Sequence, residues 1–289
     1  MSPESSDRGW RSRPKAGEPG PSASSDKGRR GRLQAAEEPG SSAPAISPAS
    51  GSRLQGRQHF QQQLQELETR ALGGLDLIVE QLDRVLEALN HQDVELAQMV
   101  IADDDRVDGR YLEVHQGILS LLALQAPVAG DLRVVAALLH VMKCIERMGD
   151  QCVNIAKLIP LSGHEPPVRR ELLDALLKMG AYARSEVTQS KAAFATRDVE
   201  LAEDLVRQDR EINRLNRDIF RMAIEIGEDA DTREWAMLMT LVARALERVG
   251  DNAVDIGEQV AFVVTGLFRE FSDSSHPMGA GGVSDGGAV

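Results

Sequence analysis

Apolar residues recur at helical spacing along most of this chain. Positions three and four residues apart lie on one face of an α-helix, so a run of apolar residues at this spacing predicts a helix with one buried side. The pattern divides into six long stretches, which are residues 58–90, 93–124, 131–161, 167–196, 198–226 and 231–269. The sequence therefore predicts an all-α fold.

Polar and rigid residues mark the ends of these stretches. Aspartate is a favoured N-cap because its carboxylate accepts a hydrogen bond from a backbone N–H of the first helical turn. Four aspartates stand at the starts of the second, third, fifth and sixth stretches: Asp93, Asp131, Asp198 and Asp231. Pro160, Pro166 and Pro167 bracket the join between the third and fourth stretches, where helices are expected to end.

Two short motifs occur twice: DVELA at 93–97 and 198–202, and ER-x-GD at 146–150 and 247–251. The first pair is offset by 105 residues and the second by 101, so the second half lacks four residues. The shortfall lies between the second and third helices of the unit, around QAPVAGDLR (125–133) and EIGEDADTR (225–233). We therefore expect a duplicated three-helix unit, which the short turns would fold into two tandem three-helix bundles.

The folded part is expected to lie between two low-complexity ends. Residues 1–56 are rich in Gly, Ser, Pro and Arg, so they carry too few apolar residues to offset the entropy cost of ordering. We predict a disordered extension at 1–56, a first repeat at 57–163, a second repeat at 164–271 and a flexible tail at 272–289. An alternative is that translation starts further downstream and part of the extension is never made.

Composition and charge narrow the classes of function. Aromatic residues make up 3% of a chain that is 42% hydrophobic, and this aliphatic-rich composition favours helices. A formal net charge of −12 argues against nucleic acid and anionic membranes as direct partners, because both bind clustered Lys and Arg. The longest apolar candidate for a membrane span, 134–145, contains His140 and Lys143 and is shorter than the roughly 18 residues required. Because the N-terminus has no hydrophobic signal sequence, we expect a cytoplasmic protein without membrane insertion.

The cysteines and the histidines within the predicted helices are expected to have structural roles. Cys144 and Cys152 fall on one predicted helix, eight residues and thus about 12 Å apart, which is too far for a disulfide bond. We interpret both as small core residues without a redox or metal role. His115 and His140 lie within predicted helices, and we expect structural roles for them.

In four predicted helices, carboxylates occupy positions where an apolar seam should continue. In the third stretch, the seam of Val135 and Met142 leads directly to Glu146 and Asp150. The other members of these acidic stripes are Asp104 and Asp108 in the second stretch, Asp209 and Asn213 in the fifth, Glu247 and Asp251 in the sixth, and Asn154 and Asp255 one turn beyond Asp150 and Asp251. We single out these residues as candidate metal ligands.

The physical reason is electrostatic. Carboxylates four residues apart on a helix are about 6 Å apart and repel each other, so something must offset the repulsion. If the second and third helices pack side by side, an Asp-xxx-Asp pair faces a Glu-xxx-Asp pair. Oxygen donors without His or Cys suit a hard cation such as Mg, Ca, Mn or oxidised iron. Gly149 and Gly250 precede the second acid of each pair, and their missing side chains leave room for a neighbouring helix or an ion.

Other interpretations of the stripes stay open. They could be solvated helix faces neutralised by Arg147 and Arg248, and Asn154 and Asp255 could equally be exposed residues. Asn213 stands where the first repeat has Asp108, which suggests a less charged second site. The chain has neither the Glu-x-x-His motifs of ferritin-like di-iron enzymes nor a Gly-rich phosphate loop, so we do not expect an enzyme. A carboxylate-bridged metalloenzyme and a plain helical dimerisation scaffold remain the alternatives.

The duplicated unit resembles the PhoU family of phosphate-transport accessory regulators. The likeness rests on QAPVAGDLR at 125–133, ERMGDQCVNIAKL at 146–158 and ERVGDNAVDIGEQV at 247–260, and it extends over about residues 58–270. It implies two PhoU repeats in a cytoplasmic, dimeric, all-helical protein without catalytic turnover.

The resemblance also implies partners and a cofactor. Members of the family restrain the phosphate ABC transporter and the phosphate sensor histidine kinase when phosphate is plentiful, so we expect contacts with the transporter's ATPase subunit and with the kinase. They carry iron clusters or other metal ions on Glu/Asp-xxx-Asp motifs, and Mn, Mg or Zn are further candidates. The motif is matched by three pairs, which are Asp104 with Asp108, Glu146 with Asp150, and Glu247 with Asp251. Asp209 with Asn213 departs from it, which leaves full occupancy of the second repeat open.

Overall fold

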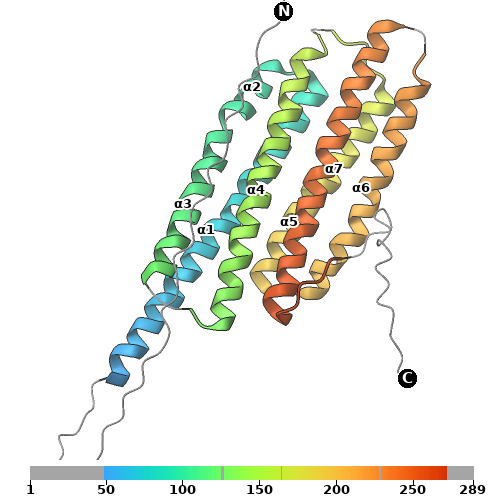
Figure 1. Cartoon of the computed structure of the whole chain (residues 1–289). Coiled ribbons are helices and arrows are strands. Elements are labelled where there is room, and N and C mark those ends of the chain that lie inside the picture. Colours follow the sequence, from blue (N-terminus) through green and yellow to red (C-terminus); the bar gives the residue numbers. More distant parts are fainter. Residues whose placement is uncertain (1–48, 125–126, 164, 228, 272–289) are drawn as a thin grey trace, which may run out of the picture. The chain divides into compact units, whose positions relative to one another are not determined.

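The computed structural model describes residues 49–124, 127–163, 165–227 and 229–271 (Figure 1). Within these ranges the backbone forms helices and no strand, which confirms the predicted all-α fold. The helices are α1 (Ala49–His91), α2 (Val94–Ala102), α3 (Asp104–Leu124), α4 (Ala129–Leu161), α5 (Arg170–Thr196), α6 (Val199–Glu225) and α7 (Ala230–Thr265).

The predicted helix at 93–124 is two helices, because the chain breaks at Asp103. The backbone N–H of Asp103 closes α2 with a 2.9 Å hydrogen bond to the carbonyl of Met99. Its carboxylate forms ion pairs with Arg84 on α1 and Arg106 on α3, which hold the junction in place. As a result Asp104 is the first residue of α3, whereas α6, the counterpart in the second half, runs without a break.

Two of the four predicted N-caps are confirmed and two are wrong. The carboxylate of Asp93 accepts the N–H of Leu96, and that of Asp198 accepts the N–H of Leu201. The N-cap of α4 is Val128 and that of α7 is Asp229, which accepts the N–H of Thr232 at 2.8 Å. The predicted caps Asp131 and Asp231 lie in the first turns of these helices. An acid in the first turn also interacts favourably with the helix dipole. An aspartate near a helix start therefore does not by itself show whether it is the N-cap or a first-turn residue.

The predicted tails fall mainly outside the described residues. The extension at 1–56 and the tail at 272–289 include residues 1–48 and 272–289, for which the structure gives no description. α1 begins at Ala49, ahead of the predicted start at residue 57. The boundaries of the repeats at 57–163 and 164–271 stay predictions.

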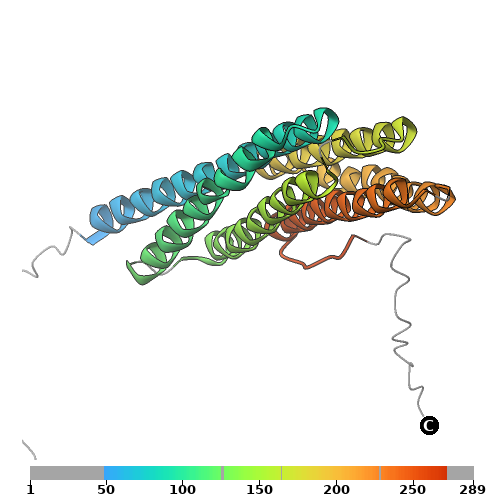
Figure 2. The same ribbon diagram turned by 90° about the horizontal axis from the view of Figure 1, so that it is seen from above.

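The helices form two corresponding sets of three, one from each half of the chain. α1, α3 and α4 pack against one another, as do α5, α6 and α7. The sets meet where α4 packs against α7 and α1 against α5, and these pairs lie side by side in both views (Figure 1 and Figure 2). Because α5 and α7 are the repeat counterparts of α1 and α4, each joining pair brings together equivalent helices that run in opposite directions.

A single apolar cluster runs through both sets. Large side chains from α1, α4 and α5, such as Leu75, Met142 and Phe194, are fully buried in it, and burial of apolar area at about 25 cal/mol per Å² is the main stabilising contribution. Cys144 and Cys152 are free and buried, as predicted. None of the described helices is apolar over a length that could cross a bilayer.

Candidate functional site

In the first repeat, the acidic stripes of α3 and α4 converge. The pKa of Asp104 is raised by burial, and the negative charges of Asp108 and Asp150 raise it further. The pKa of Asp150 is raised by burial and then by the charges of Glu146 and Asp108. The Asp-xxx-Asp pair of α3 therefore lies close enough to the Glu-xxx-Asp pair of α4 for their charges to interact.

Gly149 lets α3 and α1 approach this cluster. A Cβ atom at Gly149 would stand 3.1 Å from Oδ1 of Asp104 and 3.6 Å from Oε1 of Gln81. Gln81 comes from α1 and is 3% exposed, and a hydrogen bond from its side chain lowers the pKa of Asp104. It is a further oxygen donor beside the carboxylates. We call Gln81, Asp104, Asp108, Glu146 and Asp150 the repeat 1 cluster.

The second repeat buries its acids more deeply. Asp209 and Asn213 on α6 are almost fully buried, and Nδ2 of Asn213 donates a 2.7 Å hydrogen bond to Oδ2 of Asp209. Opposite them, a Cβ atom at Gly250 of α7 would stand 2.9 Å from Oδ1 of Asp209 and 2.8 Å from Oε2 of Glu186. Glu186 comes from α5. We call Glu186, Asp209, Asn213, Glu247 and Asp251 the repeat 2 cluster.

Glu186, like Gln81, is a cluster residue that the sequence analysis missed. Its side chain is fully buried, and neither carboxylate oxygen has a hydrogen-bond partner. Burial raises the pKa of Glu186 to about 9, and the charges of Asp209 and Asp251 contribute to the rise. An ionised carboxylate buried without a partner is very unfavourable, so without a cation this group holds a proton at neutral pH.

Two features of the sequence could have revealed Glu186. It interrupts the buried seam of α5 between Ala183 and Ser190, as the other acids interrupt theirs. It also stands 105 residues after Gln81, the offset that relates Asp104 to Asp209. Each cluster thus contains four carboxyl groups and one amide, because Gln81 with Asp108 is replaced by Glu186 with Asn213. The expectation of a less charged second site stays a prediction.

The glutamate of each ER-x-GD motif forms an ion pair with a cation of its own helix. Lys143 forms the ion pair with Glu146, and Arg244 forms the ion pair with Glu247. Both cations lie one turn before their acid, at i and i+3, where side chains on a helix meet. Neutralisation of the stripes by Arg147 and Arg248, which belongs to the alternative of solvated helix faces, stays open. Asp150 and Asp251 are exposed.

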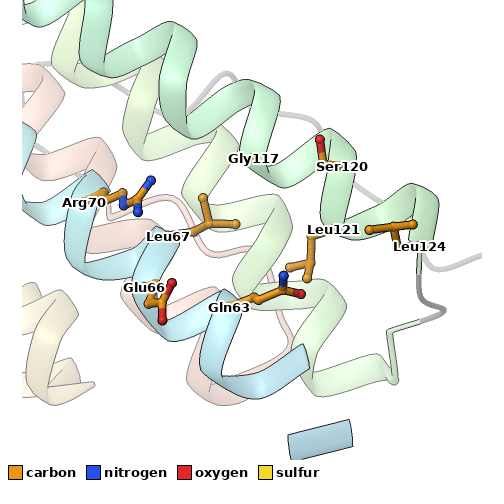
Figure 3. Close-up of a pocket in the computed structure, with 8 residues that line it drawn as sticks. All are labelled: Gln63, Glu66, Leu67, Arg70, Gly117, Ser120, Leu121 and Leu124. Carbon is orange, nitrogen blue, oxygen red and sulfur yellow. The ribbon is translucent and has the colours of Figure 1, made fainter. Parts of the chain in front are cut away.

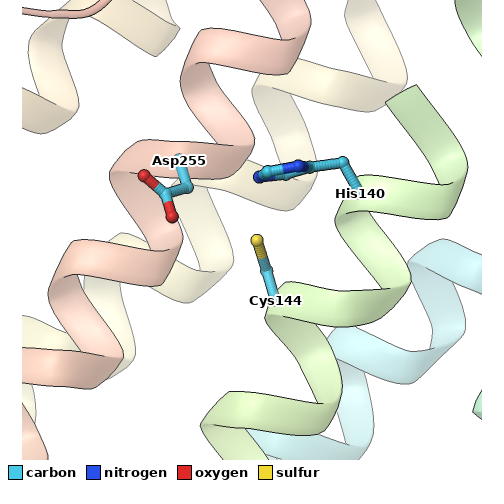
Figure 4. Close-up of side chains that lie close together, drawn as sticks. All are labelled: His140, Cys144 and Asp255. Carbon is cyan, nitrogen blue, oxygen red and sulfur yellow. The ribbon is translucent and has the colours of Figure 1, made fainter. Parts of the chain in front are cut away.

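The two outlying candidates lie apart. Asn154 is exposed on α4. Asp255 is half-buried and faces α4. Burial raises its pKa above the usual value, and the nearby His140 and Arg147 offset part of this rise. Figure 4 shows the side chains of Asp255, His140 and Cys144 pointing toward one another between α7 and α4. Asp255 thus belongs to a different group of residues from Asp251.

A pocket of about 180 Å³ lies elsewhere, between α1 and α3. Its walls include Leu67, Arg70, Gly117 and Leu124 (Figure 3). The pocket residues precede Gln81 on α1 and follow Asp104 and Asp108 on α3, so the pocket is separate from the repeat 1 cluster.

Comparison with known proteins links both clusters to one family. The family model described as the PhoU domain matches this chain twice, at residues 75–159 and 176–260, and these ranges contain every member of the two clusters. The chain is 33% identical over 201 residues to the phosphate-specific transport system accessory protein PhoU homolog of Zymomonas mobilis, covering 68% of this chain and 81% of the relative. It is 28% identical over 220 residues to the protein of the same name from Clostridium acetobutylicum, covering 75% of this chain and 99% of the relative.

A solved structure is similar over the same part of the chain. The crystal structure of the phosphate transport system regulatory protein PhoU from Streptococcus pneumoniae superimposes with a TM-score of 0.67 and 27% sequence identity. The match covers 73% of this chain and 99% of that structure. The described helices therefore have the arrangement of a complete relative.

Proposed function

Because this chain belongs to the PhoU family, we propose that it is the regulatory accessory protein of a phosphate transport system and that its two acidic clusters bind metal ions. In this proposal it acts in the cytoplasm as a homodimer. It restrains the phosphate ABC transporter through the ATPase subunit, and it restrains the phosphate sensor histidine kinase, when phosphate is plentiful. It performs no catalytic turnover.

The buried carboxyl group of Glu186 carries the metal part of the proposal. A buried polar group without a partner costs about 1–3 kcal/mol, so a fold that keeps one gains from a ligand that satisfies it. Glu186 lies close to Asp209 beside Gly250, and the negative charge of Asp209 further disfavours ionisation of Glu186. A cation between them would offset both costs.

The donor set defines the kind of ion. Both clusters supply carboxylate and amide oxygens and neither supplies sulfur or imidazole, which fits hard ions such as Mg²⁺, Mn²⁺ or oxidised iron. In the repeat 1 cluster, Asp104, Asp108, Glu146 and Asp150 would hold the ion, with Gln81 as a neutral donor. In the repeat 2 cluster, Glu186, Asp209, Glu247 and Asp251 would hold it, with Asn213 as the neutral donor.

The two clusters differ in how exposed their ligands are to solvent, which suggests different roles for the two metal sites. Asp108 and Asp150 are exposed, so an ion in the repeat 1 cluster can exchange with solvent or meet a partner protein. Glu186, Asp209 and Asn213 are buried while Asp251 is exposed, so an ion in the repeat 2 cluster is reached by solvent from the Asp251 side alone. We propose that the first site is regulatory and the second mainly stabilises the fold.

Metal analysis of the purified full chain tests the binding. We expect bound metal in the parent, less metal in Glu146→Ala/Asp150→Ala and in Glu186→Gln, and parental content in Glu113→Gln, which changes an exposed acid of α3 outside the cluster. Equal metal content in the parent and both cluster variants would exclude these sites.

A genetic experiment tests the regulation. We expect deletion of the gene to leave phosphate uptake and phosphate-starvation genes active in phosphate-rich medium, and we expect the chain to co-purify with the transporter's ATPase subunit. Normal repression in the deletion strain contradicts the regulatory role whatever the metal content.

A further inference from the structure

The contact between the two repeats contains a group of donors unlike those of the acidic clusters. His140 and Cys144 are one turn apart on α4, and Asp255 faces them from α7 (Figure 4). One donor atom from each residue lies within 4.8 Å of the other two. We call His140, Cys144 and Asp255 the inter-repeat trio.

We propose that the inter-repeat trio binds a transition metal ion of the zinc type, at a site separate from both acidic clusters. The trio offers one imidazole nitrogen, one sulfur and one carboxylate oxygen, which is a ligand set of Zn²⁺ and not of Mg²⁺ or Ca²⁺. Three protein ligands leave a fourth tetrahedral position for water. The exposed side of His140 gives solvent access to that position.

The geometry requires a modest adjustment. With bonds of about 2.0–2.3 Å around a tetrahedral ion, the donor atoms lie roughly 3.5 Å apart. The donor atoms of the trio must therefore approach one another by at most about 1.3 Å from their 4.8 Å limit. His140 is exposed and can rotate, while Cys144 is fully buried and fixes the position of the sulfur.

The groups around Cys144 determine how readily its thiol gives up a proton to a metal ion. The pKa of the Cys144 thiol is raised to about 12 by burial, and the charges of Asp255 and Glu258 also raise it, while Arg147 lowers it. The ion must therefore displace a proton from Cys144 as it binds. Asp255 and Glu258 together supply two negative charges against the single positive charge of Arg147, so the surroundings favour a cation.

The site has no second copy, although the helices that form it are equivalent. The offset of 101 residues relates His140, Cys144 and Asp255 to Leu241, Ala245 and Asn154. Leu241 and Ala245 have no donor atoms, so the opposite side of the α4–α7 contact lacks a metal set. Unlike the acidic clusters, the inter-repeat trio is therefore not a product of the sequence duplication.

An ion in this place would join the two repeats. Two ligands belong to α4 of the first repeat and one to α7 of the second. A ligand that binds the folded state alone stabilises it by mass action. Zn²⁺ should therefore raise the thermal midpoint of the metal-free full chain, and this rise should be smaller in His140→Gln.

Cobalt titration of the metal-free full chain tests the ligands. Co²⁺ bound to a thiolate gives a sulfur-to-metal charge-transfer band in the near ultraviolet, which oxygen ligands do not give. We expect the band in the parent and in Cys152→Ser, a matched control because Cys152 is buried on the same helix. We expect its loss in Cys144→Ser. In His140→Gln and Asp255→Asn we expect affinity to fall by about tenfold or more, since even outer-shell changes cost 10–100-fold.

Several outcomes overturn the proposal. No band in the parent, an unchanged band in Cys144→Ser, or equal losses in Cys144→Ser and Cys152→Ser would each do so. If Cys144→Ser fails to fold by circular dichroism, the exposed residue His140 decides, because unchanged affinity in His140→Gln rules out the trio. The band should persist in Glu146→Ala/Asp150→Ala, so failure here is distinguishable from failure of the acidic clusters.

Discussion

Glu186 on α5 and Gly250 on α7 are in direct contact, and a Cβ atom at Gly250 would stand 2.8 Å from Oε2 of Glu186. The same Cβ atom would meet Oδ1 of Asp209 at 2.9 Å and Cδ1 of Ile212 at 3.0 Å. Gly250, the glycine of the second ER-x-GD motif, therefore leaves the space in which the carboxyl groups of Glu186 and Asp209 come together. Any side chain at this position has to displace them.

Gly250→Ala should destabilise the protein by about 1–3 kcal/mol, the usual cost of overpacking a closely packed site. Urea unfolding of the metal-free chain measures it. Gly109→Ala is the matched control, because Gly109 lies within α3 with nothing within 4 Å of its added Cβ, and alanine's helix propensity should stabilise that variant by up to about 1 kcal/mol. If Gly250→Ala is also more stable than the parent, the contact described here is absent.

The metal-free protein should lose stability as the pH rises, because of Glu186. The pKa of this group is raised from 4.5 to about 9, so the folded state keeps a proton that the unfolded chain releases. Its contribution to stability is fully present below pH 4.5 and is lost as the pH rises toward 9. Between pH 4.5 and pH 7 the loss is on the order of 3 kcal/mol.

Glu186→Gln should flatten this pH dependence, since the amide has nearly the same shape and does not titrate. The measurement is the free energy of unfolding from pH 5 to pH 9 with a chelator present. Glu113→Gln, which changes an exposed acid, should keep the parental slope. A parental slope in Glu186→Gln would show that another group is responsible.

Gln81→Glu should tighten divalent metal binding in the repeat 1 cluster by about tenfold or more, because the number of charged ligands tunes the affinity of oxygen sites. Without metal, the same variant should be less stable than the parent, because it adds a buried fifth carboxyl group to the four already in the cluster. Calorimetric titration and urea unfolding give the two values. Gln61→Glu, on the exposed face of α1, should change neither. Unchanged affinity in Gln81→Glu would place residue 81 outside the site.

Asp198→Ala should cost about 1 kcal/mol, because the Asp198 carboxylate accepts the backbone N–H of Leu201 at the start of α6. Asp231→Ala should cost less, because Asp231 lies within the first turn of α7 and interacts only with the helix dipole. Thermal unfolding compares them. Equal losses in the two variants would mean that Asp231 caps its helix after all.

The repeated motifs were enough to predict the acidic clusters in outline. ER-x-GD and DVELA fixed the two offsets, and the interrupted seams identified Asp104, Glu146, Asp209 and Glu247 as acids on faces that should be apolar. These features are local, since they depend on which residues share one side of one helix. That is why they can be read from a single sequence.

Partners on other helices could not be read in this way. Glu186 and Gln81 join the clusters from a third helix in each repeat, and Asp255 faces His140 and Cys144 across the α4–α7 contact. The junction at Asp103 also depends on Arg84 of a neighbouring helix. Each of these contacts depends on the rotation and register of one helix against another.

The sequence by itself thus determined the helices, their duplication and the stripes of acid, because helical periodicity and repeat offsets are properties of the chain. The tertiary structure decided which stripes meet, which acid is left buried without a partner, and that imidazole, thiol and carboxylate come together between the repeats. Side chains from different helices become neighbours through packing alone, and packing depends on the whole set of buried surfaces at once.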